Sequence, residues 1–216
     1  MKKAFCIASA LLIAGFIAAA VFMLYMNGAL TKTYKNSDFG IPDYVSAFDA
    51  DSDGIDDQTD MLASVRAYLD TEPKYKSKYY AGGYPDDEYG VCTDVIAFGM
   101  LGAGYDLKQL VSDDITARPD AYDIDAKDSN IDFRRVRNLK VYFDRYAVVL
   151  TTDVSDFAEW QGGDIVVFEG HIGVVSDRRN KRGVPFVLHN GSVMQTAYEQ
   201  DILENRDDIV GHYRIS

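Results

Sequence analysis

The chain has 216 residues, enough for one well-filled domain and a short additional segment. Its net charge of -12 at pH 7 argues against a nucleic-acid binder, because such proteins normally carry a basic face. Of the two cysteines, Cys6 lies in an apolar N-terminal segment, so Cys92 is the single thiol of the folded part. A single thiol excludes a disulfide scaffold and a cysteine-cluster zinc site.

The N-terminal segment, residues 1–27, carries Lys2 and Lys3 followed by an uncharged, mostly apolar run. As a helix, the run from 4 to 26 would be about 34 Å long, which suffices to cross a bilayer. We therefore expect a signal anchor, a single-pass transmembrane helix. The two lysines favour a cytoplasmic N-terminus, which places the domain on the extracytoplasmic side of the cell membrane. The alternative is a cleaved secretory signal, which also exports the domain.

Residues 28–48 are mostly polar and predict a stalk that leads into the domain. The acidic segment that follows, 49–60, has the spacing of a calcium-binding loop with a glycine turn at Gly54. Its candidate ligands are Asp49, Asp51, Asp53, the backbone carbonyl of Ile55, Asp57 and Asp60. The segment resembles EF-hand loops and the calcium repeats of thrombospondin-type and dockerin modules. An acidic turn that caps the next helix is the alternative.

The calcium ion would have a structural role, since the loop contains no candidate nucleophile. Asp60 stands where EF-hand loops have a bidentate glutamate. Its shorter side chain should weaken binding, toward the ~10⁻⁴–10⁻³ M typical of extracellular modules.

The remaining residues, 61–216, predict helices first and strands later. Helices are expected at 61–69, 93–101 and 136–146, with a tyrosine-rich loop at 74–85 and a polar loop at 113–132. Short β-rich runs follow at 165–168, 172–176, 185–189 and 210–214. Helices followed by an antiparallel sheet give an α+β fold.

Three residues of this domain suggest nucleophilic catalysis. Cys92 immediately precedes a predicted helix, whose N-terminus lowers the pKa of a thiol. His171 begins a predicted strand and would serve as the general base. His189 is the best candidate to orient that imidazole and Asn190 the next, and alternation along a strand lets only one of them face His171.

The oxyanion formed during such a reaction needs hydrogen-bond donors. The backbone N–H of Cys92 is one candidate donor. The hydroxyl of Tyr79 or of Tyr80, in the tyrosine-rich loop, is a candidate second donor.

The blocks around these residues, Gly90 to Asp94, Gly163 to Val166 and His171 to Val174, resemble those of NlpC-type cell-wall cysteine peptidases. That resemblance implies a papain-like core that cleaves peptide or amide bonds of the peptidoglycan stem. It also implies that Cys92 is the nucleophile, His171 the base and His189 the orienting residue.

A closer resemblance covers nearly all of residues 56–216. The chain is similar to a bacterial family known as domain of unknown function 1287, which resembles a branch of the same papain-like clan. The matching stretches are Tyr80 to Pro85, Gly90 to Val95, Asn130 to Val136, Gly163 to Ser176, His189-Asn190 and Gly211 to Arg214. One departure from the NlpC-type pattern is Val91, which stands where those enzymes usually have aspartate.

Two arginines, Arg134 and Arg135, follow the polar loop. Arginine forks bind carboxylates well, so either side chain is a candidate to bind a carboxylate of the stem peptide. Ion pairing within this acidic protein is the alternative.

Taken together, these features predict an extracytoplasmic cysteine hydrolase that cleaves peptide or amide bonds of peptidoglycan, with no cofactor for catalysis. One alternative is a catalytically idle, calcium-stabilised module that binds the cell wall or a protein. Another is a papain-like acyl or peptidyl transferase that uses the same thiol.

Overall fold

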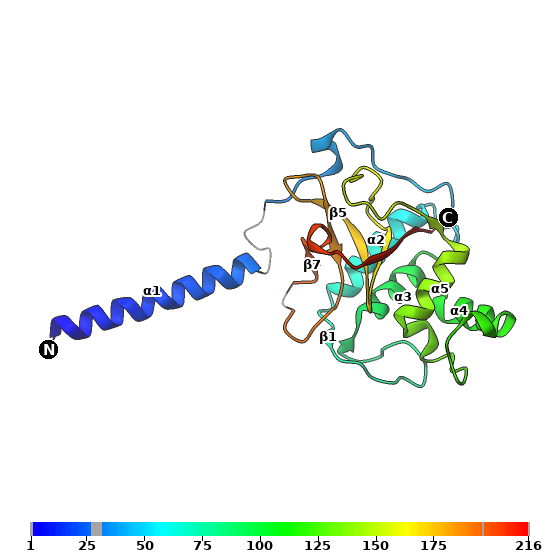
Figure 1. Ribbon diagram of the computed structural model, residues 1–216, viewed down its shortest axis with the longest axis horizontal. Helices are drawn as coiled ribbons and strands as arrows, with labels where there is room; N and C mark the ends of the chain where they lie inside the picture. The colour runs from blue at the N-terminus through cyan, green and yellow to red at the C-terminus, as the bar shows by residue number, and fades with distance from the viewer. Residues whose placement is uncertain (1, 27–31, 196, 216) are drawn as a thin grey trace. The chain divides into compact units, whose positions relative to one another are not determined.

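The computed structural model describes residues 2–26, 32–195 and 197–215 (Figure 1). The chain divides into two compact units, Met1–Lys32 and Thr33–Ser216, and each is described by itself. Helix α1 (Lys2–Met26) forms the first unit. Among the residues that the structure describes, no helix has both the length and the apolar character needed to cross a bilayer. The anchor expected over residues 1–27 therefore stays a prediction.

The second unit combines helices with an antiparallel sheet, which confirms the α+β class. Its helices are α2 (Asp57–Leu69), α3 (Cys92–Gly102), α4 (Leu107–Ala117) and α5 (Val136–Tyr146), with 3₁₀ turns η1 (Asn36–Phe39), η2 (Pro119–Ala121), η3 (Asp132–Arg134) and η4 (Leu203–Asn205). Its strands are β1 (Lys74–Tyr75), β2 (Tyr89–Gly90), β3 (Val148–Val149), β4 (Ile165–Phe168), β5 (His171–Arg179), β6 (Pro185–Leu188), β7 (Glu199–Gln200) and β8 (Ile209–Arg214).

The main sheet has the strand order β3-β8-β4-β5-β6-β7, with antiparallel neighbours throughout. Strand β5 lies inside this sheet, between β4 and β6. The short strands β1 and β2 form a separate parallel pair, and β2 ends two residues before Cys92. The order of the main sheet brings the beginning of β5 and the end of β6 to one region.

Alternation along β4 divides the core between the two faces of the sheet. Ile165 and Val167 pack with the apolar side chains of the helices, whereas Val166 and Phe168 pack on the opposite face with Trp160. This is the period-2 pattern of a strand buried on both sides. The helices thus cover one face of the sheet, as Figure 1 shows for α3 and α5.

Helix α3 is the central helix of this layer, because it contacts both α2 and β5. Gly99 permits the close approach of α2: a Cβ at this position would lie 2.5 Å from Cγ2 of Val65 and 2.8 Å from Sδ of Met61. Larger residues here would push the two helices apart. The packing of α3 between α2 and the sheet positions its N-terminal residue, Cys92.

Residues 28–48 are expected to form a stalk, but from residue 34 onward this segment packs against the domain. Asn36 is buried, donates to Oε1 of Gln161 at 2.9 Å and accepts from the Arg179 side chain. Tyr34 pairs with the backbone of Arg179 in an isolated β-bridge. The described part of this segment therefore packs onto the domain, because its polar side chains have buried partners there. Residues 28–31 lie outside the described residues.

The polar loop expected over 113–132 is also shorter than predicted. Helix α4 continues through its first part, to Ala117. Leu107, Val111 and Ile115, spaced by four residues, are buried on one face of α4. This apolar stripe stabilises the helix although the opposite face is polar.

Candidate functional site

Cys92 is the first residue of α3, which begins one residue earlier than the helix expected at 93–101. Val91 precedes it in an extended conformation, and the Asp94 carboxylate accepts the Val91 N–H at 2.8 Å. The side chain of Asp94 thus fixes the point at which the helix begins. The Cys92 residue is 9% exposed.

Burial raises the pKa of the Cys92 thiol to about 11, against the lowering effect of the backbone N–H groups of Ile172 and Thr93. The thiol is therefore protonated near neutral pH. A base must remove its proton before the sulfur can attack a carbonyl. The contact with the N–H of Ile172 places the sulfur next to the backbone of the residue that follows His171.

His171 begins β5 after the tight turn from β4, where Gly170 has a φ of +77°. Its Nε2 lies 3.0 Å from Nδ1 of His189, which follows the last residue of β6. The Nε2 of His189 in turn lies 3.0 Å from Oε1 of Gln200, at the end of β7. Three neighbouring strands thus provide one hydrogen-bonded chain of side chains.

The direction of these hydrogen bonds is set by Oε1 of Gln200, at the end of the chain of side chains. Oε1 of Gln200 accepts, so Nε2 of His189 carries the proton, and Nδ1 of a neutral His189 is then an acceptor. Nε2 of His171 must donate to that nitrogen. A neutral His171 in this tautomer has its basic lone pair on Nδ1, the nitrogen that a general base needs to have free of a proton.

Both imidazoles are neutral at pH 7. Burial and the positive charge of Arg206 together lower the pKa of His171 to about 4. Burial also lowers the pKa of His189 to about 4, with a contribution from the neighbouring His171. A neutral His171 can accept a proton, whereas an imidazolium cannot.

The structure brings Cys92 beside the strand of His171 but, among the described residues, no hydrogen bond joins the thiol to either histidine ring. Gly191 closes the other side of the histidine pair: a Cβ there would lie 2.9 Å from Nδ1 of His189 and 3.1 Å from Cε1 of His171. A side chain at position 191 would therefore push against both rings.

In the part of the chain that the structure describes, no hydrogen bond joins Asn190 to His171. Its Nδ2 donates to the carbonyl oxygens of Pro73, at 2.8 Å, and Gly90, at 3.2 Å. Of the two orienting candidates, His189 is thus the one that the structure joins to the base. Asn190 instead holds the segment that leads to Cys92, because Gly90 lies two residues before the thiol.

The two tyrosines proposed as oxyanion donors have other partners. The hydroxyl of Tyr80 donates to Asp87 at 2.7 Å, and its ring lies under the guanidinium of Arg134. Tyr79 is exposed, and its hydroxyl lies 3.5 Å from Asp128. Since neither hydroxyl contacts Cys92, the backbone N–H of Cys92 is the donor that we retain.

The two arginines of the sequence-based hypothesis have different environments. Arg134 is buried and donates to both carboxylate oxygens of Asp94, at 2.6 and 2.9 Å. Its guanidinium therefore forms a buried ion pair, which is the alternative that the sequence offers to substrate binding. Arg135 is exposed, with Nε 3.9 Å from the Asp132 carboxylate, and stays a candidate substrate contact.

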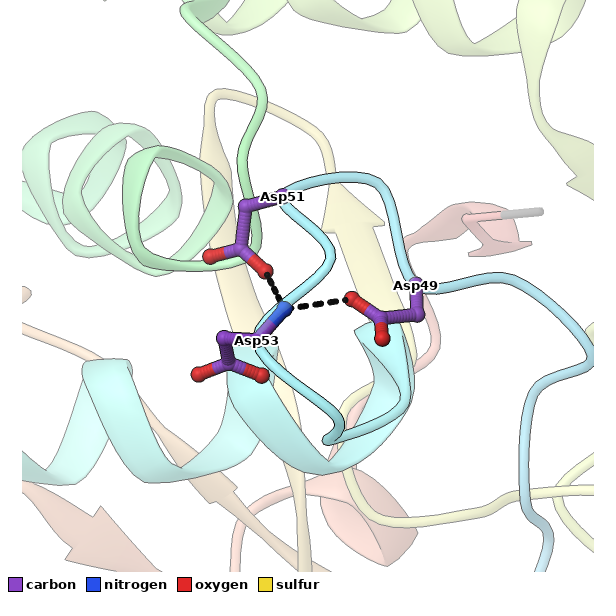
Figure 2. Close-up of side chains that lie close together, drawn as sticks. All are labelled: Asp49, Asp51 and Asp53. Carbon is purple, nitrogen blue, oxygen red and sulfur yellow. Dashed lines mark hydrogen bonds between the residues drawn. The ribbon is translucent and has the colours of Figure 1, made fainter.

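The acidic loop brings together carboxylate oxygens from Asp49, Asp51 and Asp53, all within 4.8 Å of one another (Figure 2). The N–H of Asp53 donates to the side chains of both Asp49 and Asp51, as the dashed lines in Figure 2 show. The N–H of Gly54 donates to the other oxygen of Asp49. These bonds turn the loop so that the three carboxylates lie on one side of it.

Asp60 and Asp57, two further candidate ligands of this loop, have different environments. Asp60 is buried, and burial together with the charges of Asp53 and Asp51 raises its pKa. Its carboxylate does not belong to the group of oxygens within 4.8 Å of one another that Asp49, Asp51 and Asp53 form. Asp57 has other partners: one oxygen accepts the Ala50 N–H at 2.8 Å, and the other accepts the Tyr105 hydroxyl at 2.5 Å. Asp57 therefore does not serve as the ninth-position ligand in this arrangement.

Gln200 is the residue of the histidine chain that the sequence interpretation missed. The register pairs it with Val187, so its side chain lies on the face of the sheet that also carries His189. The strand Glu199–Gln200 is too short to show a pattern from which a strand could be predicted. A prediction of β7 opposite β6 would have placed this side chain near His189.

Comparison with known proteins gives a family and a relative. Residues 62–215 match the family described as "Domain of unknown function (DUF1287)". The chain is 38% identical, over 152 residues, to the "Uncharacterized protein YijF" of Escherichia coli (strain K12), an alignment that covers 66% of this chain and 72% of that protein. No solved structure shows a significant match to the chain.

Proposed function

Given that the chain belongs to the family described as Domain of unknown function (DUF1287), we propose that it is a cysteine hydrolase with a papain-like core that cleaves amide bonds. The observation that carries this proposal is the hydrogen-bonded chain from Gln200 through His189 to His171. It gives His171 the tautomer of a general base and ends one residue from the backbone N–H that contacts the Cys92 thiol.

The proposed reaction begins with proton transfer from the Cys92 thiol to Nδ1 of His171. The sulfur then attacks the carbonyl carbon of the amide, and the backbone N–H of Cys92 stabilises the oxyanion. The C–N bond breaks as Nδ1 of His171 returns the proton to the leaving amine. Water, activated by the same nitrogen, then hydrolyses the thioester and regenerates the thiol.

The first step requires the thiol and the imidazole to approach each other when substrate binds. Catalytic hydrogen bonds are often long or absent in a free enzyme and tighten in the complex with substrate. The proposal requires the Cys92 sulfur to leave the N–H of Ile172 and to approach Nδ1 of His171. In this proposal, the buried and protonated thiol is the state of the enzyme before substrate binds.

We propose peptidoglycan stem peptides as the substrate. The support is the resemblance of the blocks around Cys92 and His171 to NlpC-type cell-wall peptidases. Exposed Arg135 is available to bind a free carboxylate of such a peptide. A substrate in the cell wall also requires that the domain lies outside the cytoplasm, which is the location expected from Lys2, Lys3 and the apolar run that follows them.

We also propose that the loop of Asp49, Asp51 and Asp53 binds a calcium ion with a structural role. Hard cations prefer several oxygen ligands, and these three carboxylates would supply them. Asp57 holds Ala50, at the start of the loop, and Tyr105, which follows α3. Calcium would therefore stabilise the contact between the loop and the end of α3.

The proposed hydrolase is tested with the full chain, as wild type and as the Cys92→Ala variant, on purified peptidoglycan. Mass spectrometry of the soluble products should show new muropeptides with the wild type and none with Cys92→Ala, a loss of roughly 10⁴-fold or more. Cys6→Ala is the matched control, because it removes the other thiol, and it should retain activity. New products from Cys92→Ala at the wild-type rate would exclude Cys92 as the nucleophile.

One observation favours a second candidate, a non-catalytic module that binds the cell wall. The Cys92 residue is only 9% exposed, as expected for a small apolar residue of the core. Sedimentation of the wild type and Cys92→Ala with insoluble peptidoglycan separates the candidates: equal binding without any product would support the binding module. An added amine acceptor that appears in the products would instead identify an acyl transferase.

A further inference from the structure

Arg206 lies in the short segment between η4 and β8 and packs against a ring that stacks on the imidazole of His171. That ring belongs to Phe168, and the guanidinium carbon of Arg206 is 4.4 Å from its centroid. The centroids of the Phe168 and His171 rings are 5.9 Å apart, with the ring planes inclined by 19°. The guanidinium carbon therefore lies at most about 10 Å from the centre of the imidazole, roughly one Debye length at 0.1 M salt.

Asp208 holds the guanidinium in this position. Nε of Arg206 donates to Oδ1 of Asp208 at 2.6 Å, and Nη2 donates to Oδ2 at 2.5 Å. A two-point pair of this kind fixes the orientation of the guanidinium as well as its place. The backbone of Asp208 is itself held, because its carbonyl oxygen accepts the N–H of Glu169 at 3.0 Å. The pair is thus joined to the β4–β5 turn that leads into His171.

The other titratable neighbours of His171 are uncharged near neutral pH. Nδ1 of His189, at the end of β6, lies 3.0 Å from its Nε2, and the Cys92 thiol of α3 lies beside the backbone that follows it. This thiol is protonated and the His189 ring is neutral, because burial opposes the charged form of each. Burial also lowers the pKa of His171. Among the described residues, the charged groups that act on that pKa are Arg206, which lowers it, and Asp208, which raises it.

Direct binding of substrate by Arg206 explains this arrangement less well. An edge of the guanidinium that could form a two-point pair with a carboxylate is the one formed by Nε and Nη2, and Asp208 already occupies it. A face of the guanidinium lies over the Phe168 ring. A side chain with these partners is better placed to exert its charge on a neighbour than to bind a second carboxylate.

We propose that Arg206 is a positioning residue for His171, whose positive charge keeps the imidazole neutral until it takes up the proton of the thiol. Asp208 and the Phe168 ring hold that charge in place. The catalytic meaning of this role rests on the proposed function, in which His171 is the general base. A nearby positive charge makes the imidazolium a stronger acid, so it would return its proton more readily to the leaving amine.

The test measures the protonation of His171 and needs no substrate. The protein is the full chain in mild detergent, as the wild type and as the variants Arg206→Gln, Arg206→Lys and Asp208→Asn. The ¹⁵N chemical shifts of the imidazole at pH 5 and low salt give the ratio of imidazolium to imidazole, and the His171 signals are those absent from His171→Gln. Arg182→Gln is the matched control, because it removes an exposed arginine that pairs with Glu204.

Arg206→Gln should raise the imidazolium ratio of His171 about twofold or more, the effect of losing a unit charge about 10 Å away in water. Asp208→Asn should lower the ratio, because it removes the negative charge that offsets Arg206. Arg206→Lys keeps the positive charge and should stay near the wild-type ratio, as should Arg182→Gln. An unchanged ratio in Arg206→Gln would overturn the inference. An equal rise in Arg206→Lys would also overturn it, because packing rather than charge would then be responsible.

Should Arg206→Gln fail to fold, Asp208→Asn decides, and a ratio equal to or above that of the wild type contradicts the inference. The pH profile of activity then separates this inference from the proposed hydrolase. The acid limb of kcat/KM reports the base of the free enzyme, so it should move to higher pH in Arg206→Gln and not in Arg206→Lys. The expected ratios in a protein that cleaves no peptidoglycan would refute the hydrolase alone, whereas cleavage with unchanged ratios would refute the role of Arg206 alone.

Discussion

Arg134 holds Asp94 through two hydrogen bonds, from Nε to Oδ1 at 2.6 Å and from Nη2 to Oδ2 at 2.9 Å. Both side chains are almost fully buried. The same Asp94 carboxylate accepts the N–H of Val91, immediately before Cys92. The ion pair therefore stabilises the turn that presents the thiol.

Replacing Arg134 with methionine should destabilise the domain by about 3–5 kcal/mol, because it leaves the Asp94 carboxylate buried and uncompensated. Arg135→Met is the matched control. Its guanidinium is exposed, so its removal should change stability by about 0.5 kcal/mol or less. Urea denaturation of the two variants measures both values. Equal losses would show that burial of the Arg134–Asp94 pair has no energetic consequence.

Gln200→Leu should lower kcat by about 10²-fold with little change in KM, because it removes the acceptor that fixes the tautomers of His189 and His171. Gln200→Glu keeps an oxygen acceptor at the same position and should retain most of the activity. Steady-state kinetics on a defined stem peptide gives both parameters. Full activity of Gln200→Leu would rule out this role for the side chain.

The stability of the domain should fall as the pH is lowered from about 6.5 to about 4. Burial lowers the pKa of both His171 and His189 from 6.5 to about 4 in the folded protein. Between these pH values the unfolded chain binds more protons than the folded chain, so protonation favours unfolding.

Calorimetric Tm values across this range measure the effect. Because carboxylates also titrate there, the comparison is with the double variant His171→Gln, His189→Gln, whose Tm should depend less on pH. An identical pH dependence in the two proteins would mean that the histidines are not buried in neutral form.

Calcium at 10 mM should raise the Tm by about 3–6 °C, if the loop binds with a Kd near 10⁻³ M and the gain is about 1.4 kcal/mol. Asp51→Asn should abolish this shift, because it removes one of the clustered carboxylates. Asp120→Asn, at an exposed site outside the loop, is the control. A calcium-dependent shift that survives in Asp51→Asn would place the ion elsewhere.

Local patterns were enough to predict the α+β class and the positions of Cys92 and His171, because each depends on residues near it in the chain. The partner of Arg134 was not predictable in this way. Asp94 lies 40 residues away and meets the guanidinium only after α3 packs against η3. An arginine destined for a buried pair and one that faces solvent, such as Arg135, look the same in a sequence.

The same reasoning applies to the partners of the histidines. The resemblance to NlpC-type peptidases implied His189 as the orienting residue, and alternation lets only one of His189 and Asn190 face His171. Gln200 depends on the register of β7 against β6, and a strand as short as Glu199–Gln200 has no periodic pattern to detect. The bonds of Asn190 likewise depend on tertiary packing, because its acceptors at Pro73 and Gly90 are far away in sequence.

The bond from Asn190 to Gly90 joins segments that are 100 residues apart, one just before the thiol and one just after His189. During synthesis at about 5–20 residues per second, the thiol therefore emerges roughly 5–20 s before its base and the base's hydrogen-bond partners exist. A growing chain cannot assemble the proposed reactive pair until most of the domain has been made. The order of the residues thus delays the proposed activity until synthesis has passed residue 200.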